Sequence, residues 1–385
     1  MAPACCNIHH FGGALFQHFP DASKNNSEFC GIIPFIRPLY PKNMESPQAA
    51  DFQRQLFRHF IAQVGEKMAV TRLCELLNLN KSSVYKRMAG EQLIKLDELL
   101  LLIKKLDLAV DELFPANHHR ISWQFPTLQQ PIRSCREYLL QVSAYFDTFA
   151  LTPGLRIWFS ANSLPLFQHL QFRELALFKI FAYARINWQL PYSEALVFDP
   201  QTFPEREIYE ELMQPILAAY LRLPTIEFWS DDLYYSTLQQ IRYFSKSGQL
   251  QDPALIQLLY DQLQLLCTHQ YDMARHGQKW TYGAKRSDVA KNSGKFDLYY
   301  NEIAPLNITL LAESPTLYGV FTVFDDPNFM FTSNEPMYAY SLAWMNKLKA
   351  KCIHISEDGE QGRRAYFQAL QNQITAQNRR TETAL

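Results

Sequence analysis

Two short helical patterns separated by only three residues constrain the fold of this chain more than any other feature. The first covers Met68–Leu77 and the second covers Lys81–Met88, with residues 78–80 between them. A connection this short needs a sharp bend, so we expect a positive φ at Asn78, because asparagine tolerates that conformation better than most residues. Asn80 is well suited to cap the second helix. The sequence therefore predicts two helices around a tight turn, the second presenting the side chains of its first turn outward.

Helical patterns also flank this pair on both sides. A first helix is expected from Ala49, with Leu56 and Phe60 on its buried face. A fourth helix follows the pair, and a short apolar segment, 108–114, would close the unit. The expected buried residues of these last two elements are Leu96, Leu99, Leu100, Ile103, Leu106, Val110, Leu113 and Phe114. We therefore predict a five-helix N-terminal domain over residues 49–115.

The segment Leu73–Phe114 resembles the Cro/C1-type (XRE-type) helix-turn-helix family without a gap. The landmarks of the resemblance are Leu73 and Cys74 in the second helix, Leu79 in the turn, Val84 in the third helix, Gly90 and Glu91 after it, Leu96–Leu99, and the closing run Leu108–Phe114. The resemblance implies a transcriptional regulator whose third helix enters the major groove of double-stranded DNA. A single short helix covers few base pairs, so we expect the regulator to be a homodimer.

By position in that family, the third helix and its cap would supply the contacts to DNA. The candidate DNA-binding residues are Asn80, Lys81, Ser82, Ser83, Tyr85, Lys86 and Arg87. Lys81, Ser82 and Lys86 would face the bases, because lysine suits guanine acceptors or phosphate and serine suits either. Asn80 and Ser83 would lie near phosphate, and Tyr85 and Arg87 would make flanking contacts.

The charge balance excludes one class of nucleic-acid binder. The chain carries 37 lysines and arginines against 38 aspartates and glutamates, for a formal net charge of -1, so it is not a polycation that coats DNA. Basic residues still gather locally: Glu91 alone opposes Lys81, Lys86, Arg87 and Lys95 in this stretch. Such a patch favours salt-dependent DNA binding. The alternative is a protein-interaction module, antitoxin-like or a scaffold, that docks a protein partner through the same helical bundle.

Residues 1–48 lack any sustained period and predict a disordered leader, with Met44 as a candidate translational start. The histidines and cysteines of this leader match no standard metal-site spacing, and the 7 cysteines of the chain include no C-x-x-C pair. We therefore expect no metal and no cofactor, and a reducing cytoplasm as the compartment. No apolar run approaches the roughly 18 residues that span a bilayer, so no membrane association is expected.

A linker at 116–120 precedes a C-terminal region, 121–385, of mixed pattern. Strands are expected at Ile121–Phe125, Leu155–Phe159, Phe296–Tyr300, Ile308–Ala312 and Tyr318–Phe324. Helices are expected at Ile132–Phe149, Gln171–Trp188, Pro204–Leu221, Asp231–Ser247, Pro253–Arg275, Glu335–Lys349 and Gly359–Gln373. The predicted fold class is α+β and mostly α, with a helical middle and a small sheet-containing module at the end. We expect this region to dimerise, to sense a small-molecule or protein effector, or both.

The C-terminal region carries no motif of a phosphate-binding loop, zinc protease, serine hydrolase or dinucleotide enzyme, so we do not expect an enzyme. A catalytic alternative would need a polar pocket with converging Asp, Glu or His side chains. Aromatic residues crowd 158–188 and 228–244 and predict a large aromatic core. A ligand pocket is the other interpretation of these rings, with Arg156, Arg185 or Arg242 holding an anion.

Overall fold

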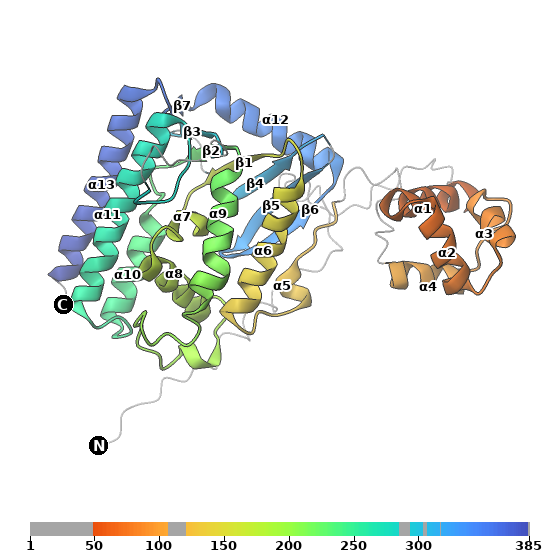
Figure 1. Ribbon diagram of the computed structural model, residues 1–385, viewed down its shortest axis with the longest axis horizontal. Coiled ribbons are helices and arrows are strands. Elements are labelled where there is room, and N and C mark those ends of the chain that lie inside the picture. The colour runs from red at the N-terminus through yellow and green to blue at the C-terminus, as the bar shows by residue number, and fades with distance from the viewer. Residues whose placement is uncertain (1–48, 107–120, 285–292, 303–305, 316, 384–385) are drawn as a thin grey trace, which may run out of the picture. The chain divides into compact units, whose positions relative to one another are not determined.

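The computed structural model describes residues 49–106, 121–284, 293–302, 306–315 and 317–383 (Figure 1). The chain divides into two compact units, Met1–Leu108 (the N-terminal unit) and Ala109–Leu385 (the C-terminal unit), and each is described by itself. The expected leader at 1–48, the closing apolar segment at 108–114 and the linker at 116–120 lie outside the described residues.

Helices make up the described part of the N-terminal unit. They are α1 (Ala49–Val64), α2 (Glu66–Leu77), α3 (Lys81–Met88) and α4 (Leu96–Leu106). Their core includes the buried side chains of Leu56, Leu73 and Val84, and α1 packs against both α2 and α3. Helix α3 has the predicted bounds, whereas α2 begins at Glu66, before the predicted Met68.

The predicted buried face of α4 is confirmed only in part, since Leu99 and Ile103 are half-buried. Leu102 is fully buried, whereas Leu96 and Leu100 are 71% and 58% exposed. The consecutive apolar residues of Leu99–Ile103 extend around the helix, so its periodicity left more than one face able to pack. Contact with α2 selects the face that carries Leu102.

A 7-stranded mixed sheet lies at the centre of the C-terminal unit, in the order β6-β5-β4-β1-β2-β3-β7. Strands β1, β2 and β3 run parallel, and the other neighbours are antiparallel. The bounds are β1 (Arg156–Ala161), β2 (Thr225–Trp229), β3 (Phe296–Tyr300), β4 (Thr309–Glu313), β5 (Tyr318–Asp325), β6 (Asn328–Thr332) and β7 (Ile353–His354).

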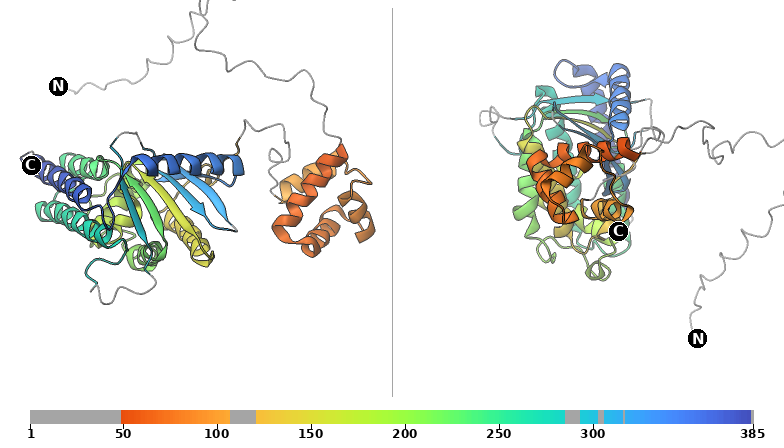
Figure 2. Two further views of the ribbon diagram at one scale, coloured as in Figure 1. Left: turned by 90° about the horizontal axis from the view of Figure 1, so that it is seen from above. Right: turned by 90° about the vertical axis from the view of Figure 1, so that its right-hand side faces the viewer.

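Helices cover both faces of this sheet (Figure 2). Ile157 and Phe159 of β1 pack into the larger core on one face, and Trp158 packs into a smaller core on the other, as strand alternation requires. Helix α12 (Glu335–Lys351) covers the smaller core. The other helices are α5 (Pro126–Gln129), α6 (Cys135–Leu151), α7 (Leu166–His169), α8 (Arg173–Ile186), α9 (Gln214–Arg222), α10 (Tyr235–Lys246), α11 (Pro253–His276) and α13 (Glu360–Glu382), with a 3-10 turn at Pro191–Ser193 and a π turn at Tyr209–Met213.

The predicted fold class, α+β and mostly α, is confirmed. Most predicted helices lie within a few residues of their predicted bounds, and α11 and α12 begin at the predicted Pro253 and Glu335. One exception is the helix predicted at Pro204–Leu221, since α9 begins only at Gln214, after the π turn. Helix α13 runs to Glu382, beyond the predicted Gln373. Strand β3 has the predicted bounds.

The prediction of a small sheet module at the end of the chain is wrong. Strand β1, predicted at Leu155–Phe159, and strand β2, which was not predicted, come from the middle of the chain and lie at the centre of the sheet, where they join β3 and β4. All residues of β2 are buried, including the polar Thr225 and Glu227, which alternate with Ile226 and Phe228 over only five residues. Such a short alternation is a weak strand signal. Strands β6 and β7 were also not predicted. The expected strand at Ile121–Phe125 reduces to a single bridge between Gln124 and Phe331.

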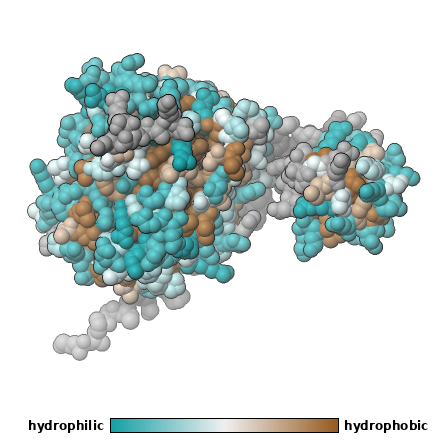
Figure 3. Space-filling view, in the orientation of Figure 1, coloured by the Kyte–Doolittle hydropathy of each residue, from teal (hydrophilic) through white to brown (hydrophobic). Residues whose placement is uncertain are grey.

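Hydrophilic side chains cover much of the C-terminal unit on the face shown in Figure 3, with apolar side chains visible between them. No helix in the described part of the chain combines the length and apolarity needed to cross a membrane.

Candidate functional site

The outward side of α3 carries most of the side chains predicted to contact DNA. Lys81, Ser82, Tyr85 and Lys86 are exposed, and we call this set the α3 surface. Their spacing along the helix places them on neighbouring positions of one side. Val84 points the other way and is buried in the core of the N-terminal unit.

The turn between α2 and α3 has the predicted backbone. Asn78 has φ 51 and ψ 48, in the left-handed region, and the N–H of Leu79 donates to the carbonyl of Cys74 at 3.1 Å. Asn80 caps α3, because its side-chain oxygen accepts a hydrogen bond from the N–H of Ser83 at 2.8 Å. Both predictions for the asparagines are therefore confirmed. Asn80 and Ser83, the predicted phosphate neighbours, bond to each other at the N-terminal end of the α3 surface.

Arg87 does not share the orientation of these residues, and its prediction as a flanking contact is corrected. Its side chain is buried, and the guanidinium Nη2 donates to both carboxylate oxygens of Glu98, at 3.0 and 3.2 Å. The same carboxylate accepts from the N–H of Lys95 at 2.9 Å. Position along α3 could not reveal this role, because it depends on an acid at the start of α4.

The basic charge of the site is consequently smaller than the sequence suggested. Lys81, Lys86 and Lys95 are exposed, but the charge of Arg87 is compensated inside the unit by Glu98. Glu91 is exposed in the loop after α3. The surface offers separate lysines rather than a dense patch, so its electrostatic contribution to DNA binding would be modest.

Gln53 of α1 supports the site from inside and was not predicted. Its Nε2 donates to the carbonyls of Arg87 and Gln92 at 2.6 and 2.8 Å, and its Oε1 accepts from the N–H of Ile94 at 2.7 Å. These bonds tie the end of α3 and its following loop to α1. The one sequence signal for this role was that Gln53 is a polar residue close to the apolar side chains on the buried face of α1.

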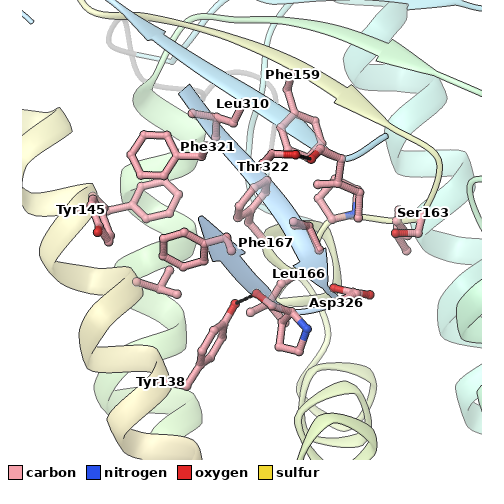
Figure 4. Close-up of a pocket in the computed structure, with 18 of the residues that line it drawn as sticks. Tyr138, Tyr145, Phe159, Ser163, Leu166, Phe167, Leu310, Phe321, Thr322 and Asp326 are labelled. Atoms are coloured by element: carbon pink, nitrogen blue, oxygen red, sulfur yellow. Dashed lines mark hydrogen bonds between the residues drawn. The ribbon is translucent and has the colours of Figure 1, made fainter. Parts of the chain in front are cut away.

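The C-terminal unit contains a second feature of functional interest, an apolar cavity of about 130 Å³. Helix α6, the segment after β1, helix α8 and the strands β4, β5 and β6 contribute its walls, and Figure 4 shows their side chains. Nearly half of the lining residues are aromatic, including Tyr145, Phe159 and Phe321. Most rings of the two aromatic-rich stretches form core, as predicted, and Phe159, Phe167 and Tyr183 also line this cavity. The interpretation as a ligand pocket stays a prediction.

One end of this cavity is polar. The Tyr183 hydroxyl donates to Oδ1 of Asp326 at 3.2 Å, and the Tyr138 hydroxyl donates to the carbonyl of Pro327 at 3.4 Å. Lys179 lies behind Asp326, fully buried, with Nζ 3.9 Å from Oδ2. Burial lowers the pKa of Lys179, and the Asp326 carboxylate acts in the opposite direction. Lys179 donates its hydrogen bond to Gln240 at 3.1 Å.

The polar end adjoins an open cleft of about 550 Å³. Ser163 and Asp326 line both the cavity and the cleft, and Asp232 lines the cleft. The cleft lies where β1 and β2 end, because Asn162 directly follows β1 and Asp232 comes shortly after β2. In sheets with parallel strands, ligands commonly bind outside these carboxyl ends.

The arginines predicted to hold an anion do not reach this pocket. Arg156, Arg185 and Arg242 line neither the cavity nor the cleft, and Arg156 instead pairs with Glu313 at 3.0 Å. Asp325 ends β5, and Asp326 begins the turn to β6 and supplies the carboxylate at the cavity.

Comparisons of this chain with protein-family models, with curated proteins and with solved structures found no significant match.

Proposed function

We propose that this protein is a DNA-binding transcriptional regulator that recognises double-stranded DNA in a sequence-specific way through a helix-turn-helix formed by α2 and α3. The observation that carries the proposal is the α3 surface: Lys81, Ser82, Tyr85 and Lys86 are exposed on a helix whose first turn is capped by Asn80. A helix held in this way can place its N-terminal side chains against base edges in the major groove. The resemblance of Leu73–Phe114 to the Cro/C1-type family supports the same function.

We further propose that the regulator acts in the cytoplasm as a homodimer and is not an enzyme. A dimer would double the number of base pairs contacted by one short helix. The C-terminal unit would then sense an effector, dimerise, or both. Its cavity and cleft support the sensing role, because small-molecule sites are mostly apolar hollows with a few polar groups.

The experiment begins with selection of bound fragments from sheared genomic DNA by the full chain, followed by mobility shift on a selected fragment. The variant Lys81→Ala/Lys86→Ala should weaken binding and reduce its dependence on salt, because two phosphate or base contacts are lost. Lys104→Ala/Lys105→Ala is the matched control, since it removes the same charge from exposed positions at the end of α4. Equal effects of the two double variants, or no retained DNA at low salt, would contradict the proposal.

A protein-interaction module is the second candidate function, and one observation favours it. Leu96 and Leu100 expose large apolar side chains on the same helix, α4, as a protein-binding surface would. Capture of a stoichiometric protein partner that is lost in Leu96→Ser/Leu100→Ser, without any DNA binding by the parent chain, would support this function instead.

A further inference from the structure

We propose that the C-terminal unit binds a small organic cation, with a ring or short alkyl chain in the cavity and an ammonium group at the Asp326 carboxylate. The inference names a ligand class for the effector and rests on the proposed regulator only for that role. Binding itself concerns the C-terminal unit and requires no DNA.

The size of the cavity limits the apolar part of the ligand. A dry cavity of roughly 150 Å³ in another protein accommodates benzene. The cavity here, at about 130 Å³, is of the same order. Its walls offer ring faces and edges from Tyr145, Phe159 and Phe321, which suit another ring or a short chain. A single ring or an equivalent aliphatic group therefore fits, whereas a fused polycyclic compound does not.

The charge at the opening selects the polar part of the ligand. Asp326 and Asp232 both line the cleft, and its lining includes no lysine or arginine. Lys179 is near Asp326 but fully buried on the inner side, where Gln240 accepts its hydrogen bond. Carboxylates facing a cleft with no lining cation attract a positive ligand and repel an anion.

The Asp326 carboxylate also has room to accept another donor. Among the described residues, Tyr183 supplies the one hydrogen bond to it, at Oδ1. Its side chain is 33% exposed and lines the cleft, so a ligand can reach the carboxylate from there. An ammonium group placed there would make a charge-assisted hydrogen bond next to the apolar cavity.

The test compares three probes with the same phenyl ring and different charge: phenethylamine (cation), phenethyl alcohol (neutral) and phenylacetate (anion). Each is titrated into the full chain by calorimetry at neutral pH without DNA. We expect phenethylamine to bind about tenfold more tightly than phenethyl alcohol, because a charge-assisted bond is stronger than a neutral one, and phenylacetate to bind most weakly.

Two variants separate the carboxylate from the cavity. Asp326→Asn should lower the affinity for phenethylamine by about tenfold and change the affinity for phenethyl alcohol by less than about twofold. Asp325→Asn is the matched control, because the neighbouring acid is exposed and lines neither hollow, and it should change neither probe. Val142→Phe adds a ring to the cavity wall without touching the carboxylate and should weaken both probes.

Several outcomes overturn the inference. These are no binding of any probe, equal affinity for the three, tighter binding of phenylacetate, or equal effects of Asp326→Asn and Asp325→Asn. If Asp326→Asn does not fold, the order of the three probes on the parent chain and the effect of Val142→Phe decide the result. Failure of DNA binding in the mobility-shift experiment leaves this titration unaffected, so the two proposals fail separately.

Discussion

Arg87 and Glu98 lie 11 residues apart in sequence and form an ion pair that joins α3 to α4, with Arg87 buried and Glu98 half-buried. Arg87 was predicted to contact DNA, but the ion pair directs its side chain away from the α3 surface. Arg87 instead helps to hold α3 against α4. The N-terminal unit thus uses separate residues to hold α3, namely Gln53, Arg87 and Glu98, and to present its outward side chains.

Breaking this pair should destabilise the N-terminal unit. We expect Glu98→Gln to lower its free energy of unfolding by about 2 kcal/mol or more, because Arg87 would remain buried without a countercharge. Hydrogen exchange of the α3 amides, measured by mass spectrometry, checks this. Asp97→Asn is the control, since Asp97 is exposed in the same turn, and it should exchange like the parent. Unchanged exchange in Glu98→Gln would show that the pair contributes little.

The cap of α3 allows stability and DNA binding to be separated. Asn80→Ala removes the acceptor for the Ser83 N–H and should cost about 1 kcal/mol of stability. Asn80→Asp keeps an acceptor but adds a negative charge beside the α3 surface, so it should stay folded and weaken DNA binding. Thermal unfolding and mobility shift measure the two effects. If Asn80→Asp bound DNA as tightly as the parent chain, the N-terminus of α3 would not lie near a DNA phosphate.

Stability should fall as the pH is lowered below about 6.5, partly through His169. This residue is fully buried, and its ring nitrogens lie 3.0 Å from the Pro165 carbonyl and 2.9 Å from Thr237 Oγ1. Burial lowers the pKa of His169 well below its usual value, so the folded state stays neutral there while the unfolded state gains a proton. The proton bound only by the unfolded state makes folding less favourable, by up to about 1.4 kcal/mol per pH unit.

Urea unfolding between pH 7 and pH 5 tests this assignment against the variant His169→Gln. The variant should be less stable at pH 7. Its unfolding free energy should fall less steeply as the pH is lowered, by the slope that corresponds to about one proton. Burial also lowers the pKa of His269, so the residual slope keeps the same sign. Identical slopes in the parent and the variant would exclude His169 as a contributor.

The aromatic core should be sensitive to single truncations. Phe178 is fully buried, with its ring centroid 5.5 Å from that of Phe198 and 5.9 Å from that of Phe244. Phe178→Ala should lower the unfolding free energy of the C-terminal unit by about 3–5 kcal/mol, through lost burial and a cavity. Tyr340→Ala, which removes an exposed side chain of α12, should cost less than about 0.5 kcal/mol. Urea unfolding compares them, and similar midpoints would mean that the core relaxes around the missing ring.

Local signals predicted the elements whose conformation depends on nearby residues. Asn78 and Asn80 have the expected backbone and cap because a left-handed φ and an N-cap bond depend on residues a few positions away. The helices α11 and α12 were also located from the sequence, to within two residues at either end. Strand β2 was missed although Thr225 and Glu227 alternate with Ile226 and Phe228, because an alternation over five residues is a weak signal.

The sequence alone thus determined the α3 helix, its cap and the α+β class, since each follows from short-range backbone preferences and from hydrophobic periodicity. Tertiary structure decided which way Arg87 points, which face of α4 is buried, and that Asp326 rather than an arginine lies at the cavity. These outcomes depend on contacts between residues far apart in the chain. Asp326 meets Tyr183 only because the sheet brings β5 and α8 together, and no local pattern encodes that distance.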